Sequence, residues 1–296
     1  MNTAEMTAQI ATGNGFIAAL DQSGGSTPKA LRGYGVEDSE WSGDEEMFAR
    51  IHEMRSRVIT APSFASGKVI GAILFERTMD GEVDGKSTPD ALKARGVVPF
   101  IKVDQGLADE ENGAQMMKPL DKLPAVLEKS VAKGMYGTKM RSVIKSANAA
   151  GIAAVVEQQF AVGNKIADAG LMPMLEPEYD ITADDRAEGE KILRDELKKG
   201  LDALPADRKV MLKLSIPVEA GLYSDIIGHP NVLKVVALSG GFSTDDACAH
   251  LGKNGGMIAS FSRGLLQDLQ KGQSDAEFDA VLGKAIDQIH AASVAG

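Results

Sequence analysis

The stretch Val210-Met211-Leu212-Lys213-Leu214 is an apolar run that contains one cation. A short, almost continuous apolar run is typical of a strand buried on both faces of a parallel sheet. Lysine is rarely buried without a partner, because removing its ammonium group from water costs free energy. Burial also lowers the pKa of lysine, and the neutral amine is a nucleophile toward carbonyl carbon. The stretch predicts either a lysine that forms a Schiff base or a strand-end lysine whose ammonium group reaches solvent.

Similar short apolar runs recur along the chain and alternate with amphipathic segments. Such alternation is typical of βα units arranged around a parallel sheet. We predict about eight strands, which is the number that closes a β/α barrel. They cover residues 16–20, 69–75, 98–103, 136–140, 171–175, 210–214, 233–238 and 257–261. The sequence therefore predicts the α/β class and a (β/α)8 TIM barrel.

The segments between these runs carry apolar residues at helical spacing. Residues 47–58 and 278–289 each place apolar side chains on one face of a helix, and the second helix should complete the barrel. Residues 152–160 include an Ala-Ala-Val-Val run that could form a strand, but their spacing favours a helix. Residues 79–87 are predicted to form a polar loop, and no low-complexity linker divides the chain. We therefore expect a single domain over residues 1–296.

Composition and charge narrow the class of protein. The chain has 296 residues, of which 44% are hydrophobic and 25% are charged, as is typical of a globular protein with a large core. No apolar stretch reaches the roughly 18 residues of a membrane span, and the N-terminus lacks the pattern of a signal peptide. The net charge of −10 argues against a nucleic-acid surface. A single cysteine, Cys248, excludes an internal disulfide and favours a reducing compartment, so we expect a cytoplasmic protein.

Metal and cofactor sites are not indicated by the sequence. The four histidines are His52, His229, His250 and His290, and no two of them have metal-ligand spacing. Cys248 lies in a predicted helix, where a small buried hydrophobic residue is expected rather than a nucleophile. We therefore predict no metal and no cofactor.

Polar and charged residues gather at the carboxyl end of nearly every predicted strand. They are Asp21 and Ser23, Glu76, Lys102 and Asp104, Lys139 and Arg141, Glu176 and Glu178, Lys213 and Ser215, Ser239, and finally Ser260, Ser262 and Arg263. Active sites of β/α barrels are built at this end of the strands. Residues two apart on a strand point the same way, so Lys102 with Asp104 and Glu176 with Glu178 should face the same space.

Three loops have the composition of anion sites. Ser239-Gly240-Gly241 ends the seventh strand and runs into a segment that can begin a helix, and Ser262-Arg263 follows the eighth. Backbone N–H groups near a helix N-terminus bind phosphate, and the loops after strands seven and eight form the usual phosphate site of this barrel. The first loop contributes Ser23 and Ser26 beside two glycines. Two separate anion sites would suit a substrate that carries a phosphate at each end.

Eight pieces in the same order resemble one known family. They are Ala-Leu-Asp21-Gln-Ser-Gly-Gly-Ser26, Gly-Ala-Ile-Leu-Phe-Glu76, Ile-Lys102-Val-Asp104-Gln-Gly, Lys139-Met-Arg141, Met-Leu-Glu176-Pro-Glu178, Leu-Lys213, Leu-Ser239-Gly-Gly and Ser262-Arg263-Gly-Leu-Leu-Gln. The chain resembles class I fructose-1,6-bisphosphate aldolases, and among them the shorter bacterial branch.

The resemblance implies a role for each matching residue. Lys213 matches the lysine that forms the Schiff base, and Glu176 matches the proton acceptor, with Glu178 as its neighbour. Asp21 and Lys139 match polar residues beside the reacting carbons. The remaining matches are phosphate-binding: Lys102, Arg141, Ser23 and Ser26 toward the distal phosphate, and Ser239, Gly240, Gly241, Ser262 and Arg263 toward the phosphate nearest the ketone.

The chain departs from the animal members of that family at three places. Gln22 stands where they have glutamate, Ala30 stands where they have arginine, and their C-terminal tail ending in tyrosine is absent from this sequence. Contacts of the first loop, and the proton transfers assigned to that tyrosine, must therefore be made by other means.

These observations imply a lyase that reversibly cleaves fructose 1,6-bisphosphate to dihydroxyacetone phosphate and glyceraldehyde 3-phosphate, in glycolysis or gluconeogenesis. The partner expected is a phosphorylated sugar, with no nucleic acid and no membrane, and a homo-oligomer is compatible with the sequence. Two alternatives remain open. The chain could be another Schiff-base sugar-phosphate aldolase or transaldolase, or a barrel that binds sugar phosphates without catalysis.

Overall fold

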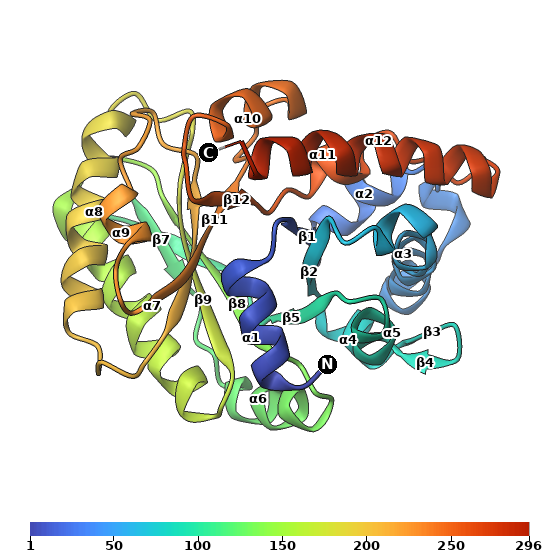
Figure 1. The fold of residues 1–296 in the computed structure, drawn as a ribbon, viewed down its shortest axis with the longest axis horizontal. Coiled ribbons are helices and arrows are strands. Elements are labelled where there is room, and N and C mark those ends of the chain that lie inside the picture. The colour runs from blue at the N-terminus through green and yellow to red at the C-terminus, as the bar shows by residue number, and fades with distance from the viewer. Residues whose placement is uncertain (296) are drawn as a thin grey trace.

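A parallel barrel of eight strands forms the centre of the computed structural model, which describes residues 1–295 (Figure 1). In spatial order the strands are β1 (Phe16–Leu20), β2 (Val69–Leu74), β5 (Val98–Lys102), β8 (Gly137–Ile144), β9 (Met172–Tyr179), β10 (Val210–Ser215), β11 (Val232–Leu238) and β12 (Met257–Ala259). Every neighbouring pair in this order is parallel. The Ala19 amide donates to the Phe261 carbonyl over 3.3 Å, which brings the last strand beside the first. The predicted TIM barrel is confirmed.

Helices surround the barrel, and α7 and α8 lie side by side on one flank in Figure 1. The outer helices are α2 (Ser26–Gly33), α3 (Gly43–Thr60), α4 (Glu76–Asp80), α5 (Thr88–Ala94), α6 (Leu123–Ala132), α7 (Ala149–Asp168), α8 (Arg186–Asp202), α9 (Ser224–Ile227), α10 (Thr244–Leu251), α11 (Arg263–Leu266) and α12 (Asp275–Ser293). The helices predicted over residues 47–58, 152–160 and 278–289 are confirmed as parts of α3, α7 and α12. No helix among the 295 described residues is long and apolar enough to cross a membrane.

Two hydrophobic cores follow from the alternation of side chains along each strand. Leu212 and Leu214 point outward, into the core between strands and helices, whereas Met211 points into the barrel. Helix α1 (Thr3–Thr12) contributes Met6 and Ile10 to the inner core, so it covers that end of the barrel. Because Lys213 lies two residues beyond Met211, its side chain also points into the barrel, toward the open end.

The predicted strand positions are correct, but their ends and two hairpins differ. Strands β8 and β9 continue past the expected 140 and 175 because β7 (Ala114–Met117) pairs antiparallel with β8 and extends the sheet there. Strand β6 (Leu107–Glu111) pairs antiparallel with β7, and this hairpin was not predicted. The expected polar loop over 79–87 instead contains the end of α4 and a short hairpin of β3 (Glu82–Val83) and β4 (Lys86–Ser87).

Candidate active site

Four charged side chains of alternating sign form a chain inside the open end of the barrel. Lys213 Nζ lies 3.0 Å from Glu176 Oε1, and Lys139 Nζ lies 2.8 Å from Glu176 Oε2. Lys139 Nζ also lies 2.7 Å from Asp21 Oδ2. These residues come from β10, β9, β8 and the loop after β1, and Lys213, Glu176 and Lys139 are 3–4% exposed. Each buried charge therefore has an opposite charge in direct contact, as burial requires.

The pairing controls the protonation of the two carboxylates. Burial by itself would raise the pKa of Glu176, but the charges of Lys139 and Lys213 outweigh it and hold that pKa below 4.5. The same balance of burial against Lys139 and Lys213 holds the pKa of Asp21 far below 3.8. Burial opposes the charged form of Lys139, yet Asp21 and Glu176 raise its pKa above 10.5. Lys139 is therefore a fixed cation and both carboxylates are ionised.

A second set of ion pairs lies nearer the rim. Arg141 Nε lies 2.5 Å from Glu178 Oε2, and Lys102 Nζ lies 2.6 Å from Asp104 Oδ1. The other Asp104 oxygen accepts a hydrogen bond from the Arg141 amide over 3.2 Å. Glu178 thus pairs with Arg141, whereas Glu176 pairs with lysines. The two glutamates face the same space, as predicted. The protonation state of Glu176 is set by Lys139 and Lys213.

A glutamine ties the first loop to the loop that follows the last strand. The Gln22 amide nitrogen donates to Ser262 Oγ, and its carbonyl oxygens accept from the guanidinium of Arg55. Ser26 donates its hydroxyl to the Ser23 carbonyl over 2.9 Å and begins α2. Gln22 is thus held between a cation and a hydroxyl.

The glycines of the seventh loop are required by the backbone. Gly240 has a φ of +61° and Gly241 a φ of +130°, which side chains with a Cβ rarely adopt. A Cβ at Gly240 would lie 2.6 Å from Ile181 Cγ2. These two residues lead to α10, which begins with Ser243 as its cap. The loop therefore presents bare backbone close to a helix N-terminus.

All the residues that the sequence predicts for the site line two adjoining pockets. The larger, of about 620 Å³, is lined by Asp21, Ser26, Lys139, Arg141, Glu176, Glu178, Lys213, Ser239, Gly240, Gly241, Ser262 and Arg263, together with Gln22, Ala30 and Ser260. The smaller, of about 340 Å³, shares Asp21 and Lys139 and adds Ser23, Lys102 and Asp104. The buried charged residues therefore lie between the outer ends of the two pockets, and hydrogen-bond donors line both of these ends.

Two strand-end residues lie outside this site. Glu76 faces the outside of the barrel, 3.0 Å from Lys129 Nζ. Ser215 is buried, and its hydroxyl donates to the Tyr179 carbonyl over 2.6 Å and accepts from the Tyr179 amide. Its role is to join β9 to β10.

The sequence also missed one residue that contacts the site, the fully buried Arg55 of α3. A signal was present, since Arg55 interrupts the apolar face formed by Ile51 and Val58.

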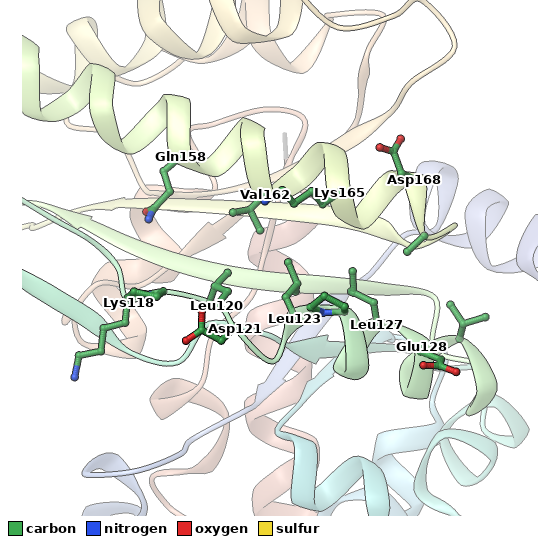
Figure 2. Close-up of a pocket in the computed structure, with 14 residues that line it drawn as sticks. Lys118, Leu120, Asp121, Leu123, Leu127, Glu128, Gln158, Val162, Lys165 and Asp168 are labelled. Carbon is green, nitrogen blue, oxygen red and sulfur yellow. The ribbon is translucent and has the colours of Figure 1, made fainter.

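A groove larger than either of these pockets lies elsewhere, between α6 and α7 on the outside of the barrel (Figure 2). It has a volume of about 970 Å³ and is lined by apolar residues such as Leu123, Leu127 and Val162. Its charged residues, including Lys118 and Asp168, are exposed to solvent. Without a buried ionisable group it has no means of shifting a pKa, so the inner pockets are the better candidate for catalysis.

No cluster of three or more His, Cys, Asp or Glu side chains arranged to hold a metal ion occurs within residues 1–295. Cys248 is half-buried on α10, and burial, with a contribution from Asp245, raises the pKa of its thiol to about 11. It is therefore a weak nucleophile near neutral pH.

The fold and the site define a β/α barrel with a buried lysine and carboxylates at the carboxyl ends of its strands. A sequence model of the family described as Fructose-bisphosphate aldolase class-I matches residues 2–213. The chain belongs to this family of aldolases, which are lyases.

A solved structure agrees on the fold. A fructose-bisphosphate aldolase from Plasmodium falciparum, determined in complex with TRAP and a small-molecule inhibitor, superposes with a TM-score of 0.74 at 18% identity, covering 99% of this chain and 95% of that one. A xylose isomerase-like TIM barrel/4-hydroxyphenylpyruvate dioxygenase fusion protein gives a TM-score of 0.46 at 13% identity over 79% of this chain and 40% of its own. The second similarity is too low to support an inference.

Proposed function

We propose that the protein reversibly cleaves fructose 1,6-bisphosphate to dihydroxyacetone phosphate and glyceraldehyde 3-phosphate through a Schiff base on Lys213. The observation that supports this most directly is the contact of 3.0 Å between Lys213 Nζ and Glu176. It places a proton acceptor against the amine in a buried pocket, as nucleophilic catalysis by lysine requires. Membership of the aldolase family supports the same reaction class.

Formation of the Schiff base needs a neutral amine. Glu176 is the base in contact with Lys213, so it takes one proton from the ammonium group. The amine nitrogen then attacks the ketone carbon, and the carbonyl oxygen becomes a hydroxyl by taking a second proton from that nitrogen. Glu176 returns its proton to this hydroxyl, which leaves as water. The result is a protonated imine on Lys213 and an ionised Glu176.

Cleavage uses the imine as an electron sink. Glu176 takes the proton of the hydroxyl at carbon four, the bond between carbons three and four breaks, and its electron pair enters the imine to give an enamine. The aldehyde product leaves. Glu176 then returns the proton to carbon three, and water hydrolyses the imine to release dihydroxyacetone phosphate and regenerate Lys213.

Lys139 and Asp21 support these proton transfers. Lys139 lies between Glu176 and Asp21 and remains charged because both carboxylates raise its pKa. Its charge stabilises the ionised form of Glu176, which each cycle must restore. Asp21 in turn fixes the position of the Lys139 ammonium group.

The two phosphates of the substrate are assigned to opposite ends of the pockets. Ser239, the backbone of Gly240 and Gly241, Ser262 and Arg263 would hold the phosphate nearest the ketone, as donors beside helix N-termini do. Lys102, Arg141, Ser23 and Ser26 would hold the distal phosphate. Arg263 is exposed at the mouth of the larger pocket and takes part in no ion pair among residues 1–295. Its guanidinium is therefore available to an anion.

We further propose that catalysis needs no metal, that the chain is a single catalytic domain, and that it acts in the cytoplasm in glycolysis or gluconeogenesis. The matched family is described as glycolytic, which supports this assignment.

Borohydride trapping tests the proposal. The protein is incubated with fructose 1,6-bisphosphate or dihydroxyacetone phosphate, reduced and digested, and the adduct is located by mass. We expect it on Lys213. An adduct on Lys102 or Lys139 would retain the reaction class and overturn the assigned nucleophile. A folded protein that binds the sugar phosphate but gives no adduct would contradict Schiff-base chemistry. Cleavage of fructose 1-phosphate in preference to the bisphosphate would contradict the assigned substrate.

A further inference from the structure

Arg55 is a fully buried cation that has no carboxylate in contact among the ion pairs of residues 1–295. It lies on α3 and contacts both α4 and the first loop. Its Nη1 donates to Thr78 Oγ1 over 2.7 Å, and its Nη2 donates to the main-chain and side-chain carbonyl oxygens of Gln22. Burial lowers the pKa of Arg55 to about 10, and the charge of Asp21 partly offsets that effect. Arg55 therefore stays charged near neutral pH.

Burial of a guanidinium without a carboxylate costs folding free energy, because its hydration is replaced only by hydrogen bonds to neutral groups. A role for the residue would explain why that cost is tolerated. Replacement by an apolar side chain of similar size is a change that cores generally tolerate. The ion pairs of the site and the packing contacts of α3 do not explain why residue 55 carries a positive charge. What the guanidinium does contact is Gln22, which connects the first loop to the loop after the last strand.

That connection runs through Gln22. With its carbonyl oxygen held by Arg55, the Gln22 side chain can present only its amide nitrogen to the other side, where it donates to Ser262 Oγ. Ser262 is followed by the exposed Arg263, and both line the larger pocket. The two arms of the guanidinium have different partners: Nη2 contacts both Gln22 oxygens, while Nη1 contacts Thr78 on α4, so the planar group joins the first loop to α4.

We propose that Arg55 is a positioning residue that, through Gln22, fixes Ser262 and Arg263 for the phosphate nearest the ketone. This inference rests on the proposed function for the identity of the substrate. Without Arg55 the glutamine amide can turn over, and the first loop is no longer tied to the loop after the last strand. Binding of the phosphate group should weaken, while the chemistry at Lys213 continues.

The test compares Arg55→Met with Arg57→Met. Arg57 lies on the same helix but contacts Asp275 and the ring of Phe278, away from the pockets. We expect Arg55→Met to raise KM for the bisphosphate about tenfold, with kcat changed less than about threefold, as loss of uniform binding requires. Arg57→Met should lower the melting temperature without changing KM. If both variants lose stability and neither changes KM, Arg55 is only structural and the proposal is wrong.

A double-mutant cycle tests the route through glutamine. We expect Gln22→Met to raise KM as Arg55→Met does, and the double variant to raise it no further than either single variant, because all three break the same connection. Independent, additive effects would overturn the route through Gln22. Gln22→Met also keeps the proposal testable if Arg55→Met fails to fold.

A binding measurement separates this proposal from the proposed reaction. Stabilisation of the protein by inorganic phosphate, followed by its melting temperature, needs no turnover. We expect the stabilisation in the wild type and in Arg57→Met, and a smaller one in Arg55→Met. If the wild type cleaves no sugar phosphate yet shows this pattern, the proposed function fails and the role of Arg55 stands. If cleavage occurs and phosphate stabilises Arg55→Met equally, the positioning role fails alone.

Discussion

Glu176 on β9 lies 3.0 Å from Lys213 on β10, two residues beyond the paired Met174 and Met211. The parallel register therefore brings carboxylate and amine to the same level of the barrel, both pointing inward. The second oxygen of Glu176 contacts Lys139 at 2.8 Å. One carboxylate thus contacts two buried cations, and whatever removes its charge affects both lysines.

Replacing the lysine should separate catalysis from folding. We expect Lys213→Met to retain less than about 1% of aldolase activity, because Lys139, the other amine that contacts Glu176, also pairs with Asp21 and stays charged, so it cannot replace Lys213 as the nucleophile. The fold should persist, since methionine fills a similar volume among apolar strand residues. Activity and circular dichroism are the measurements. Lys234→Met on β11 is the control: Lys234 is half-buried but lines neither site pocket. Substantial activity in Lys213→Met would show that another group is the nucleophile.

Replacing the carboxylate should impair both stability and turnover. Glu176→Gln leaves Lys213 and Lys139 with a neutral amide, and breaking a buried ion pair in this way costs about 3–5 kcal/mol of unfolding free energy. Loss of a general base should lower kcat at least about a hundredfold. Urea denaturation and steady-state kinetics measure the two effects.

The control for this change is Glu178→Gln, whose carboxylate contacts Arg141 nearer the rim. It should cost less stability, because Arg141 is partly exposed to solvent. An equal loss of stability in the two variants would contradict the central position that we assign to Glu176.

Local sequence was sufficient to predict most of the fold. Lys213 could be placed on a strand because its neighbours Met211, Leu212 and Leu214 are apolar, and burial on both faces leaves such runs nearly continuous. Strand ends were less certain: β8 and β9 extend through charged residues such as Arg141 and Glu178, which the pattern suggested as terminal. The extension of β8 pairs with β7 and that of β9 pairs with β8, and sequence periodicity does not describe such contacts between segments.

The hairpin of β6 and β7 shows where local signals conflict. Asn112 and Gly113 both have positive φ, as a tight hairpin turn requires, and Asn-Gly is a strong hairpin signal. The flanking residues Asp109, Glu110 and Glu111 are charged and have low strand propensity, so no strand was predicted beside the turn.

The residues of the site could be predicted more completely than their partners. Charged residues at strand ends indicated which side chains meet at the mouth, and those predicted do line the pockets. The register places Arg141 opposite Glu176, yet Arg141 pairs with Glu178 and Lys139 pairs with Glu176, so the partners depend on side-chain direction as well as on register. Arg55 was missed because its helix is remote in sequence from the loop that it holds.

Acid should destabilise the protein through the buried carboxylates. The pKa values of Asp21 and Glu176 are lowered in the folded state from 3.8 and 4.5, so the folded state binds fewer protons than the unfolded one. Their stabilisation is fully present above those unfolded values and is lost as pH falls through the folded values. We expect the free energy of unfolding to decrease steadily below about pH 4.5.

The comparison that isolates Asp21 is a pair of asparagine variants measured by urea denaturation at several pH values. Asp21→Asn should be less stable than the wild type at neutral pH and should lose less stability on acidification. Asp287→Asn removes an exposed carboxylate that contacts Lys68, and its pH dependence should match that of the wild type. Identical acid dependence in all three proteins would show that Asp21 does not contribute to acid sensitivity.

The backbone at Gly240 should be required for binding phosphate. Gly240→Ala would place a Cβ 2.6 Å from Ile181 Cγ2 at a φ of +61°, so the loop must move. The left-handed conformation alone costs about 1–2 kcal/mol for a residue with a Cβ. Because Gly240 and Gly241 line the larger pocket, we expect KM for the bisphosphate to rise about tenfold or more.

Gly85→Ala is the matched control, since Gly85 has a φ of +70° with open space around its Cβ position. It carries a similar conformational cost but lies in the turn between β3 and β4, outside the site pockets. Both variants should therefore melt at lower temperature, and only Gly240→Ala should change KM. A KM that is unchanged in Gly240→Ala would mean that the phosphate does not use this loop, and the anion would then have to be held by Ser262 and Arg263.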